Sequence, residues 1–225
     1  MRSIVVTGGF GILGRAVAEA FRANGDRVAR IDFAPSAADE NPGGIDLGSV
    51  DLTDAAATSA AVERVIAAQG GIDVLVNVAG GFTWQTLADG GPETWARMFS
   101  MNATTCVTMT KAALPTLSAT KGAAIVNIGA GGAILAAAGM GGYAASKAAV
   151  HKLTESLAAE LAGTDCTVNA VLPSIIDTPT NRADMPDADT SQWVQPASLA
   201  QVIVFLASPA ARAISGALIP VSRGG

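Results

Sequence analysis

The sequence predicts an α/β protein built around one parallel sheet. Short, nearly continuous apolar segments alternate with longer segments of helical period, a pattern typical of buried parallel strands joined by helices. A glycine-rich turn separates the first apolar segment from the first helical one. Half of the 225 residues are apolar, so a large core is available. We therefore expect a single-domain, Rossmann-type, doubly wound parallel sheet of about seven strands with helices on both faces.

The individual elements follow from hydrophobic period and from the positions of Gly, Pro and Asp. In the first half we expect a strand that ends at Thr7, a helix after the glycines, a strand at 27–31, an irregular stretch at 33–48, a helix near 54–69 and a strand at 73–78. In the second half we expect a helix at about 92–117, a strand at 123–128, a helix that ends near Leu161, a strand at 166–172, a helix near 197–207 and a strand near 217–221. No linker divides the chain, so 1–225 is expected to be one domain, with a short substrate loop at about 174–196.

Composition excludes several classes of function. The net charge of −5 argues against a nucleic-acid surface and against steering toward anionic membranes. The chain starts with a strand, so we expect neither a signal peptide nor a membrane span. Cys106 and Cys166 lie far apart and there is one His, so no metal site is predicted. The chain is expected to be a reduced, cytoplasmic protein that acts on a small molecule.

The glycine-rich turn, Thr7-Gly8-Gly9-Phe10-Gly11-Ile12-Leu13-Gly14, predicts a site for a dinucleotide pyrophosphate. Asp32 ends the next strand, where a carboxylate accepts the hydroxyls of an adenosine ribose and repels a 2′-phosphate. Arg15 and Arg30 are nearby cations that could soften this repulsion. We expect NAD as cofactor, with NADH preferred and NADP not excluded. The alternative is that Asp32 only caps a turn.

Tyr143 and Lys147 lie four residues apart in an alanine-rich helical stretch, so their side chains share one face of that helix. A phenol with an ordinary pKa near 10 exchanges protons poorly at neutral pH. We expect the ammonium of Lys147 to lower the pKa of Tyr143 and to make it an acid–base catalyst. The alternative is a tyrosine at the edge of the core beside a solvated lysine.

Taken together, these motifs resemble the short-chain dehydrogenase/reductase family over nearly the whole chain. Asn77-Val78-Ala79-Gly80 is similar to the family's Asn-Asn-Ala-Gly, and the run from Pro173 to Thr178 is similar to its Pro-Gly-x-x-x-Thr. The resemblance implies an oxidoreductase with the catalytic residues Tyr143, Lys147 and Asn102. It also implies the cofactor-binding residues Gly8, Phe10, Gly11, Ile12, Gly14, Asp32, Asp51, Leu52, Asn77, Ala79, Gly80, Tyr143, Lys147, Pro173, Ile176 and Thr178.

One position departs from the family. Most members have a Ser thirteen residues before the Tyr, where it donates a hydrogen bond to the substrate carbonyl, and here that position is Ala130. Losing one such donor typically costs two to four orders of magnitude in a reaction that relies on it. Three explanations remain open: an inactive protein, a substrate that needs no Ser, or a donor from elsewhere in the chain.

Within the family, quinonoid dihydropteridine reductases also lack this Ser, and several runs here resemble theirs. The longest is the run from Asp177 to Trp193. The resemblance implies hydride transfer to an electron-poor ring, with Tyr143 as the proton donor. Residues that would line a flat substrate slot are Phe82, Trp84, Met140, Met185 and Trp193, unless they belong to the core. Alternatives are a carbonyl reductase or alcohol dehydrogenase for a small ketone, and a redox-silent NAD(H)-binding protein.

Oligomer formation is also implied by the family resemblance. Members commonly associate through the helix at 92–117 and the helix of Tyr143, and the latter has small apolar outward positions. These are Ala145, Ala148, Ala149 and Leu153. We expect a homodimer or homotetramer, and we expect His151 to serve helix packing or this interface.

Overall fold

The structure is a computed structural model that describes residues 1–223. It confirms the predicted fold class. Seven parallel strands form one sheet in the order β3-β2-β1-β4-β5-β6-β7. The strands are β1 (Ser3–Thr7), β2 (Arg27–Ile31), β3 (Ile45–Leu47), β4 (Val74–Asn77), β5 (Ala123–Ile128), β6 (Cys166–Pro173) and β7 (Leu218–Val221). The α-helices are α1 (Ile12–Ala23), α2 (Ala55–Gln69), α3 (Pro92–Met98), α4 (Thr105–Ala119), α5 (Gly141–Glu160), α6 (Pro179–Asp184) and α7 (Pro196–Leu206).

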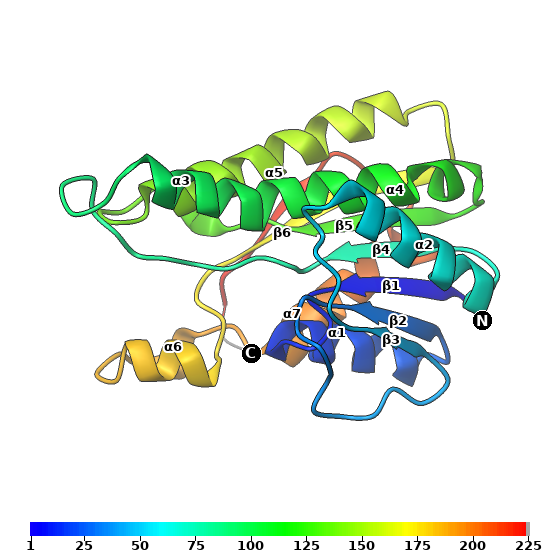
Figure 1. Cartoon of the computed structure of the whole chain (residues 1–225), viewed down its shortest axis with the longest axis horizontal. Coiled ribbons are helices and arrows are strands. Elements are labelled where there is room, and N and C mark those ends of the chain that lie inside the picture. The colour runs from blue at the N-terminus through cyan, green and yellow to red at the C-terminus, as the bar shows by residue number, and fades with distance from the viewer. Residues whose placement is uncertain (224–225) are drawn as a thin grey trace.

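Helices cover both faces of the sheet (Figure 1), with α2, α4 and α5 on one side and α1 and α7 on the other. Each side has its own apolar core, and the central strands contribute alternate residues to the two. Val6 of β1, for example, packs with Phe21 of α1, whereas its neighbour Val5 packs with Val65 of α2. This burial on both faces explains why the strands read as continuous apolar runs.

The chain reverses its direction across the sheet between β3 and β4, so β1 lies between β2 and β4. In an open parallel sheet the carboxyl ends of the strands beside such a reversal form the ligand crevice. The glycine turn after β1, Asp32 after β2 and the segment after β4 all lie at this edge. The fold therefore brings the predicted cofactor residues to one place.

Two elements differ from the sequence-based expectation. The stretch 33–48 contains the short strand β3, which pairs with β2 and was too short to be found from hydrophobic period. The helix expected at 92–117 continues to Ala119 and is interrupted by a π-helical segment, Phe99–Thr104, between α3 and α4. Such a segment adds one residue to a turn and leaves no clear trace in an apolar pattern.

Within residues 1–223, no helix is long and apolar enough to cross a membrane. Over the same range, no three or more His, Cys, Asp or Glu side chains are grouped so that they could hold a metal ion.

Candidate active site

The glycines of the turn after β1 serve two different purposes. Gly8 has a left-handed backbone, with φ of 61°, and a Cβ there would lie 2.9 Å from the backbone of Ala79. A Cβ on Gly14 would overlap the carbonyl oxygen of Gly8, so close packing requires both glycines. Gly11 is exposed and begins α1 without a side-chain cap. The open backbone at this helix start fits a pyrophosphate, which the helix dipole and the free N–H groups favour.

Asp32 is fixed beside this turn. Its Oδ2 atom accepts a hydrogen bond of 2.9 Å from the N–H of Phe10, and its Oδ1 atom accepts one of 3.0 Å from the N–H of Ala34. The side chain is half-buried, and each carboxylate oxygen keeps a further lone pair. The carboxylate is thus fixed in place and can still accept hydrogen bonds from another donor.

The two cations near Asp32 are both paired with carboxylates. Arg30 is inaccessible to solvent and donates to Asp46 at 2.7 and 2.9 Å and to the carboxylate of Asp39 at 2.9 Å. These bonds, Asp46 first, raise the pKa of Arg30. Arg15 lies 3.9 Å from the same Asp39. Arg15 and Arg30 are the two cations near Asp32 that could attract a 2′-phosphate, and both are engaged in ion pairs.

The segment after β4 is held by side chains beneath the site. Thr7 Oγ1 accepts hydrogen bonds from the N–H groups of Val78 and Ala79, at 3.0 and 3.1 Å. Asn77 is buried and donates to Thr110 and Asn127 at 3.0 and 2.9 Å. Asn77 thus lies in a buried polar layer that supports the crevice. Ala79 and Gly80 follow it at the crevice edge.

Asp51 and Leu52, which were predicted to lie beside the adenine, differ in exposure. Asp51 is exposed, and hydrogen bonds from the side chain and backbone of Thr53 lower its pKa. Leu52 is 4% exposed and belongs to the core with α2. Only the Asp51 side chain is therefore on the surface.

Lys147 and Tyr143 lie one turn apart on α5, facing the end of β5. Lys147 is buried, and its Nζ atom donates to the carbonyl oxygen of Ile128 at 2.8 Å. Burial lowers the pKa of Lys147 to about 8. Burial also raises the pKa of Tyr143 to about 12. The prediction that Tyr143 has a lowered pKa is therefore wrong, because burial removes water from around the phenol.

Asn102 lies in the π-helical segment and connects three parts of the site. Its Oδ1 atom accepts from the N–H of Gly81 at 2.9 Å, and its Nδ2 atom donates to the carbonyl oxygen of Gly81 at 3.0 Å. Nδ2 also donates to Ser146 Oγ at 3.0 Å, and that hydroxyl donates to the carbonyl oxygen of Tyr143 at 2.7 Å. Sequence reasoning missed Ser146, although its place directly before Lys147 was a signal.

Ala130 provides no hydrogen-bond donor to the crevice. Its methyl group cannot donate, its N–H bonds to His151 Nε2 at 3.2 Å, and its carbonyl oxygen accepts from the N–H of Ala133 at 3.1 Å. His151 is 5% exposed, so it packs inside the subunit. The missing Ser is thus not replaced by the backbone of the same residue.

The segment after β6 is folded rather than loose. Thr178 caps α6 by accepting from the N–H of Asn181 at 3.2 Å, and Asn181 donates to the carbonyl oxygen of Ile176 at 2.8 Å. Hydrogen bonds from Arg182 and Gln195 lower the pKa of Asp177 to about 2. The expected substrate loop is therefore anchored at Pro173, Ile176 and Thr178, at the carboxyl end of β6.

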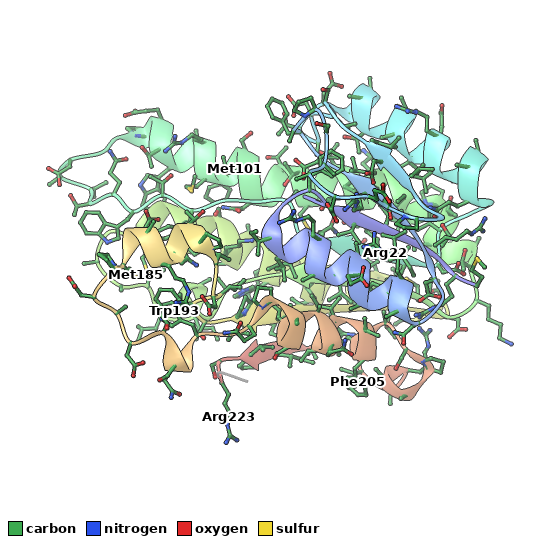
Figure 2. The ribbon with its side chains drawn as sticks, turned by 90° about the horizontal axis from the view of Figure 1, so that it is seen from below. Arg22, Met101, Met185, Trp193, Phe205 and Arg223 are labelled. Carbon is green, nitrogen blue, oxygen red and sulfur yellow. The ribbon has the colours of Figure 1, made fainter. Side chains whose placement is uncertain are left out.

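The five predicted substrate residues are not equivalent. Phe82 and Trp84 are 52% and 60% exposed, and the edge of Phe82 meets Tyr143 with ring centroids 4.9 Å apart. Met140 and Met185 are half-buried. Trp193 is 4% exposed, so its side chain offers little surface to a ligand. Figure 2 shows Met185 and Trp193 on the same projecting part of the chain, around α6.

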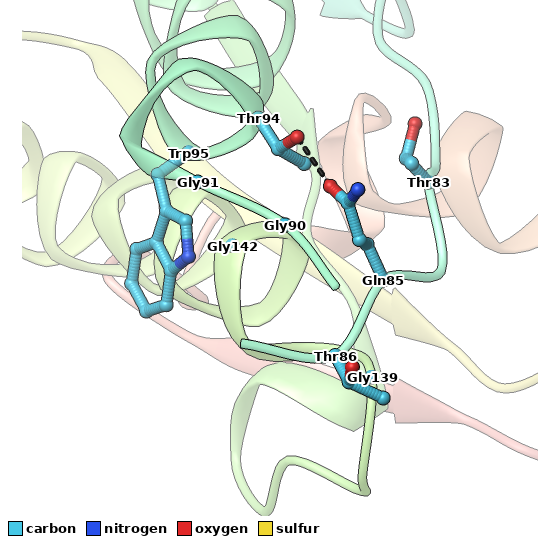
Figure 3. Close-up of a pocket in the computed structure, with 9 residues that line it drawn as sticks. All are labelled: Thr83, Gln85, Thr86, Gly90, Gly91, Thr94, Trp95, Gly139 and Gly142. Carbon is cyan, nitrogen blue, oxygen red and sulfur yellow. Dashed lines mark hydrogen bonds between the residues drawn. The ribbon is translucent and has the colours of Figure 1, made fainter. Parts of the chain in front are cut away.

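A small pocket lies between the loop after β4 and the start of α5 (Figure 3). Gln85 joins the two segments, because its N–H donates to the carbonyl oxygen of Gly139 at 2.8 Å and its side chain accepts from Thr94. The pocket volume of about 10 Å³ has room for one water at most. The pocket is therefore a seam that fixes the segment before Tyr143, and it is too small for a substrate.

Comparison with known proteins agrees with this architecture. The family model for short chain dehydrogenase matches residues 2–189. The chain is 31% identical over 235 residues to 3-oxoacyl-acyl-carrier-protein reductase FabG of Thermotoga maritima, covering 98% of this chain and 96% of that protein. The ligand-free aldohexose dehydrogenase of Thermoplasma acidophilum superposes with a TM-score of 0.88 at 27% identity, covering 98% and 92% of the two chains. The 3-ketoacyl-acyl-carrier-protein reductase of Brucella melitensis complexed with NADH has a TM-score of 0.87 at 26% identity, covering 98% and 96%.

This chain therefore belongs to the short-chain dehydrogenase/reductase family. It is an NAD(P)-dependent oxidoreductase of that family.

Proposed function

We propose that the protein is an NADH-dependent reductase that transfers hydride to an electron-poor conjugated ring, such as quinonoid dihydropteridine, with Tyr143 as the proton donor. The observation that carries this proposal is the environment of Ala130. Its side chain lacks a donor, and both of its backbone groups are bonded within the protein. A ketone relies on a positioned donor to stabilise the oxyanion that develops as hydride arrives. A quinonoid ring spreads that charge over several atoms, so one proton donor suffices.

The preference for NADH rests on the charges around Asp32. The dinucleotide supplies the hydride when it is bound. The glycine turn and the start of α1 hold its pyrophosphate, and Asp32 accepts the ribose hydroxyls. A 2′-phosphate would meet the Asp32 carboxylate while Arg15 and Arg30 are engaged with Asp39 and Asp46. This arrangement of charges supports the proposed preference for NADH over NADPH.

The protonation state of Tyr143 supports its proposed role as the proton donor. Because burial raises its pKa to about 12, the phenol carries its proton at neutral pH. A protonated phenol is a donor, which is what reduction requires. Lys147 shares the same helix face and is positively charged below its pKa of about 8. Its charge stabilises the phenolate left after the proton has been given to the substrate.

Carbonyl reduction, or the reverse oxidation of an alcohol, is the second candidate. It is favoured by the names of the similar proteins, which include an oxoacyl reductase and an aldohexose dehydrogenase. A redox-silent NAD(H)-binding role is the third candidate. A redox-silent protein gains nothing from a buried cation one turn from a tyrosine, and burying that charge costs stability. Shifted groups of this kind are typical of catalytic sites.

Stopped-flow oxidation of NADH, with quinonoid 6,7-dimethyldihydropterin and with a panel of small ketones, separates these candidates. We expect turnover with the pterin and little with ketones. In Ala130→Ser, the restored hydroxyl should raise ketone reduction by about 10- to 1000-fold, the range for one oxyanion donor, and should leave pterin reduction unchanged or lower. A large gain with both acceptors would identify an impaired carbonyl reductase and overturn the pterin proposal.

We further propose that the enzyme acts in the cytoplasm as a homodimer or homotetramer. The helical stretch around the π-helical segment exposes large apolar side chains, among them Phe99, Met101 and Val107 at 39%, 38% and 45%. Such side chains on neighbouring turns are typical of a surface that is covered in an oligomer. Sedimentation of the unmodified protein and of Val107→Glu tests this. A monomer in both cases would refute it.

A further inference from the structure

The carboxyl end of β5 is held from α5 at two points. Lys147 Nζ donates to the carbonyl oxygen of Ile128 at 2.8 Å, and one helical turn later His151 Nε2 accepts from the N–H of Ala130 at 3.2 Å. Between them, the N–H of Gly129 bonds to Val171 of the neighbouring strand at 2.9 Å. Three successive residues are thus fixed just where the chain leaves the sheet to form the wall of the crevice.

His151 and Gly129 fit together. A Cβ on Gly129 would lie 2.5 Å from His151 Nε2 and 2.7 Å from Cδ2, so only glycine at this position admits the imidazole. The histidine side chain is 5% exposed. An apolar residue would fill this space equally well. The imidazole nitrogen adds one property, which is an acceptor for the otherwise unpaired buried N–H of Ala130.

Accepting this bond fixes the state of the ring. Nε2 needs a lone pair, so the imidazole must be neutral and must carry its proton on Nδ1. Burial, assisted by the positive charges of Lys147 and Lys152, lowers the pKa of His151 below its ordinary value. The neutral ring required by the geometry is therefore also the form that its surroundings favour.

We propose that His151 is a positioning residue, which holds the crevice wall at Ala130 and the Lys147 ammonium in register with Tyr143. It touches neither cofactor nor substrate and acts through the end of β5. Family members with a Ser at the position of Ala130 have a side chain there that reaches into the site. In this chain Ala130 contributes only a methyl group to the wall. The position of this part of the wall then depends on the hydrogen bond from the N–H of Ala130 to His151. The inference holds for whichever acceptor the oxidoreductase reduces.

The chain contains a single histidine, so its NMR signals are unambiguous in untagged protein. In protein labelled with ¹⁵N-histidine, we expect the long-range ¹H–¹⁵N spectrum at pH 7 to show a proton on Nδ1 and a hydrogen-bonded, unprotonated Nε2. Hydrogen exchange should show the amide of Ala130 to be protected. A proton on Nε2, or rapid exchange of this amide, would overturn the proposal without reference to any substrate.

Two variants test the functional consequence. His151→Leu fills the space without an acceptor, whereas the Oε1 atom of His151→Gln can replace Nε2. We expect kcat of the Leu variant to fall about 10- to 100-fold, the scale of a misplacement near 1 Å, with the Kd of NADH little changed. The Gln variant should recover most of kcat and the protection of the Ala130 amide. Unchanged kcat in the Leu variant, or equal loss in both variants, would contradict the role.

Turnover is followed with whichever of quinonoid 6,7-dimethyldihydropterin and 2,3-butanedione the unmodified protein reduces faster. If it reduces neither, the proposed function fails, and the tautomer and amide exchange still decide the role of His151. If the Leu variant does not fold, two measurements decide the role of His151. These are the tautomer of His151 in the unmodified protein and the exchange of the Ala130 amide in the unmodified protein and in the Gln variant.

Discussion

Lys147 should make the protein more stable as the pH rises above 8, which is a rare direction for a lysine. Its pKa is lowered from 10.5 to about 8 because its ammonium is buried. Below pH 8 the lysine is protonated in both folded and unfolded chains, and the folded state bears the full cost of the buried charge. Between pH 8 and 10.5 only the unfolded chain binds the proton, so the free energy of unfolding rises by about 1.4 kcal/mol per pH unit. The whole shift corresponds to about 3 kcal/mol.

The matched comparison is with Lys147→Met, which keeps the length of the side chain and has no proton to lose. Urea unfolding, followed by tryptophan fluorescence at one protein concentration, gives both free energies from pH 7 to 10. Loss of the bond to Ile128 lowers the stability of the variant by a constant amount, about 1 kcal/mol or more. The difference between the two proteins should still grow by about 2 kcal/mol from pH 8 to 10. A flat difference would show that Lys147 is not a buried cation of lowered pKa.

Three further substitutions test other parts of the site. Tyr143→Phe should lower turnover by about 10²- to 10⁴-fold and leave the Kd of NADH nearly intact, and full activity of this variant would remove the phenol from the mechanism. Asp32→Ala should weaken NADH and relieve the exclusion of NADPH by roughly 1–3 kcal/mol in titrations of both dinucleotides, whereas a native preference for NADPH would refute the ribose role. Asp46→Ala leaves two donors of the buried Arg30 unpaired and should lower the free energy of unfolding by about 2–4 kcal/mol. The control is Glu155, which forms a solvent-accessible ion pair with Lys152 at 2.7 Å. Glu155→Ala should cost about 0.5 kcal/mol or less, and equal effects of the two substitutions would show that Arg30 is solvated.

The features that the sequence predicted well are those with strong local signals. The strand before the glycine turn is buried along its whole length, and its centre, Ile4-Val5-Val6, reads as a short apolar run. The helix near 54–69 was delimited by Asp54, whose side chain caps it, and by Gly70, which has a left-handed backbone with φ of 84°. The doubly wound arrangement followed from the alternation of elements and the handedness of crossovers. The fold class could therefore be predicted from rules that act over short distances along the chain.

The features that the sequence did not predict depend on contacts between distant residues. Strand β3 has three residues and exists because it pairs with β2. Arg30 lies on a strand, where a charged residue predicts exposure, yet carboxylates from 39 and 46 enclose it. The pKa of Tyr143 depends on how completely its ring is covered, which spacing to Lys147 does not reveal. Each of these needed the tertiary arrangement.

The two shifted pKa values bear on the proton transfer from Tyr143 that we propose. Burial stabilises the neutral forms of Tyr143 and Lys147, so the phenol keeps its proton while the ammonium holds its charge at a cost. Cys106 faces the same ammonium, but burial raises its pKa to about 12, and it stays a neutral thiol. In the reaction that we propose, Tyr143 gives up its proton and leaves a phenolate one helical turn from the ammonium of Lys147. The charge that is costly in the resting protein would then stabilise the product of proton transfer, and an interaction that is stronger after the transfer than before it would lower the barrier.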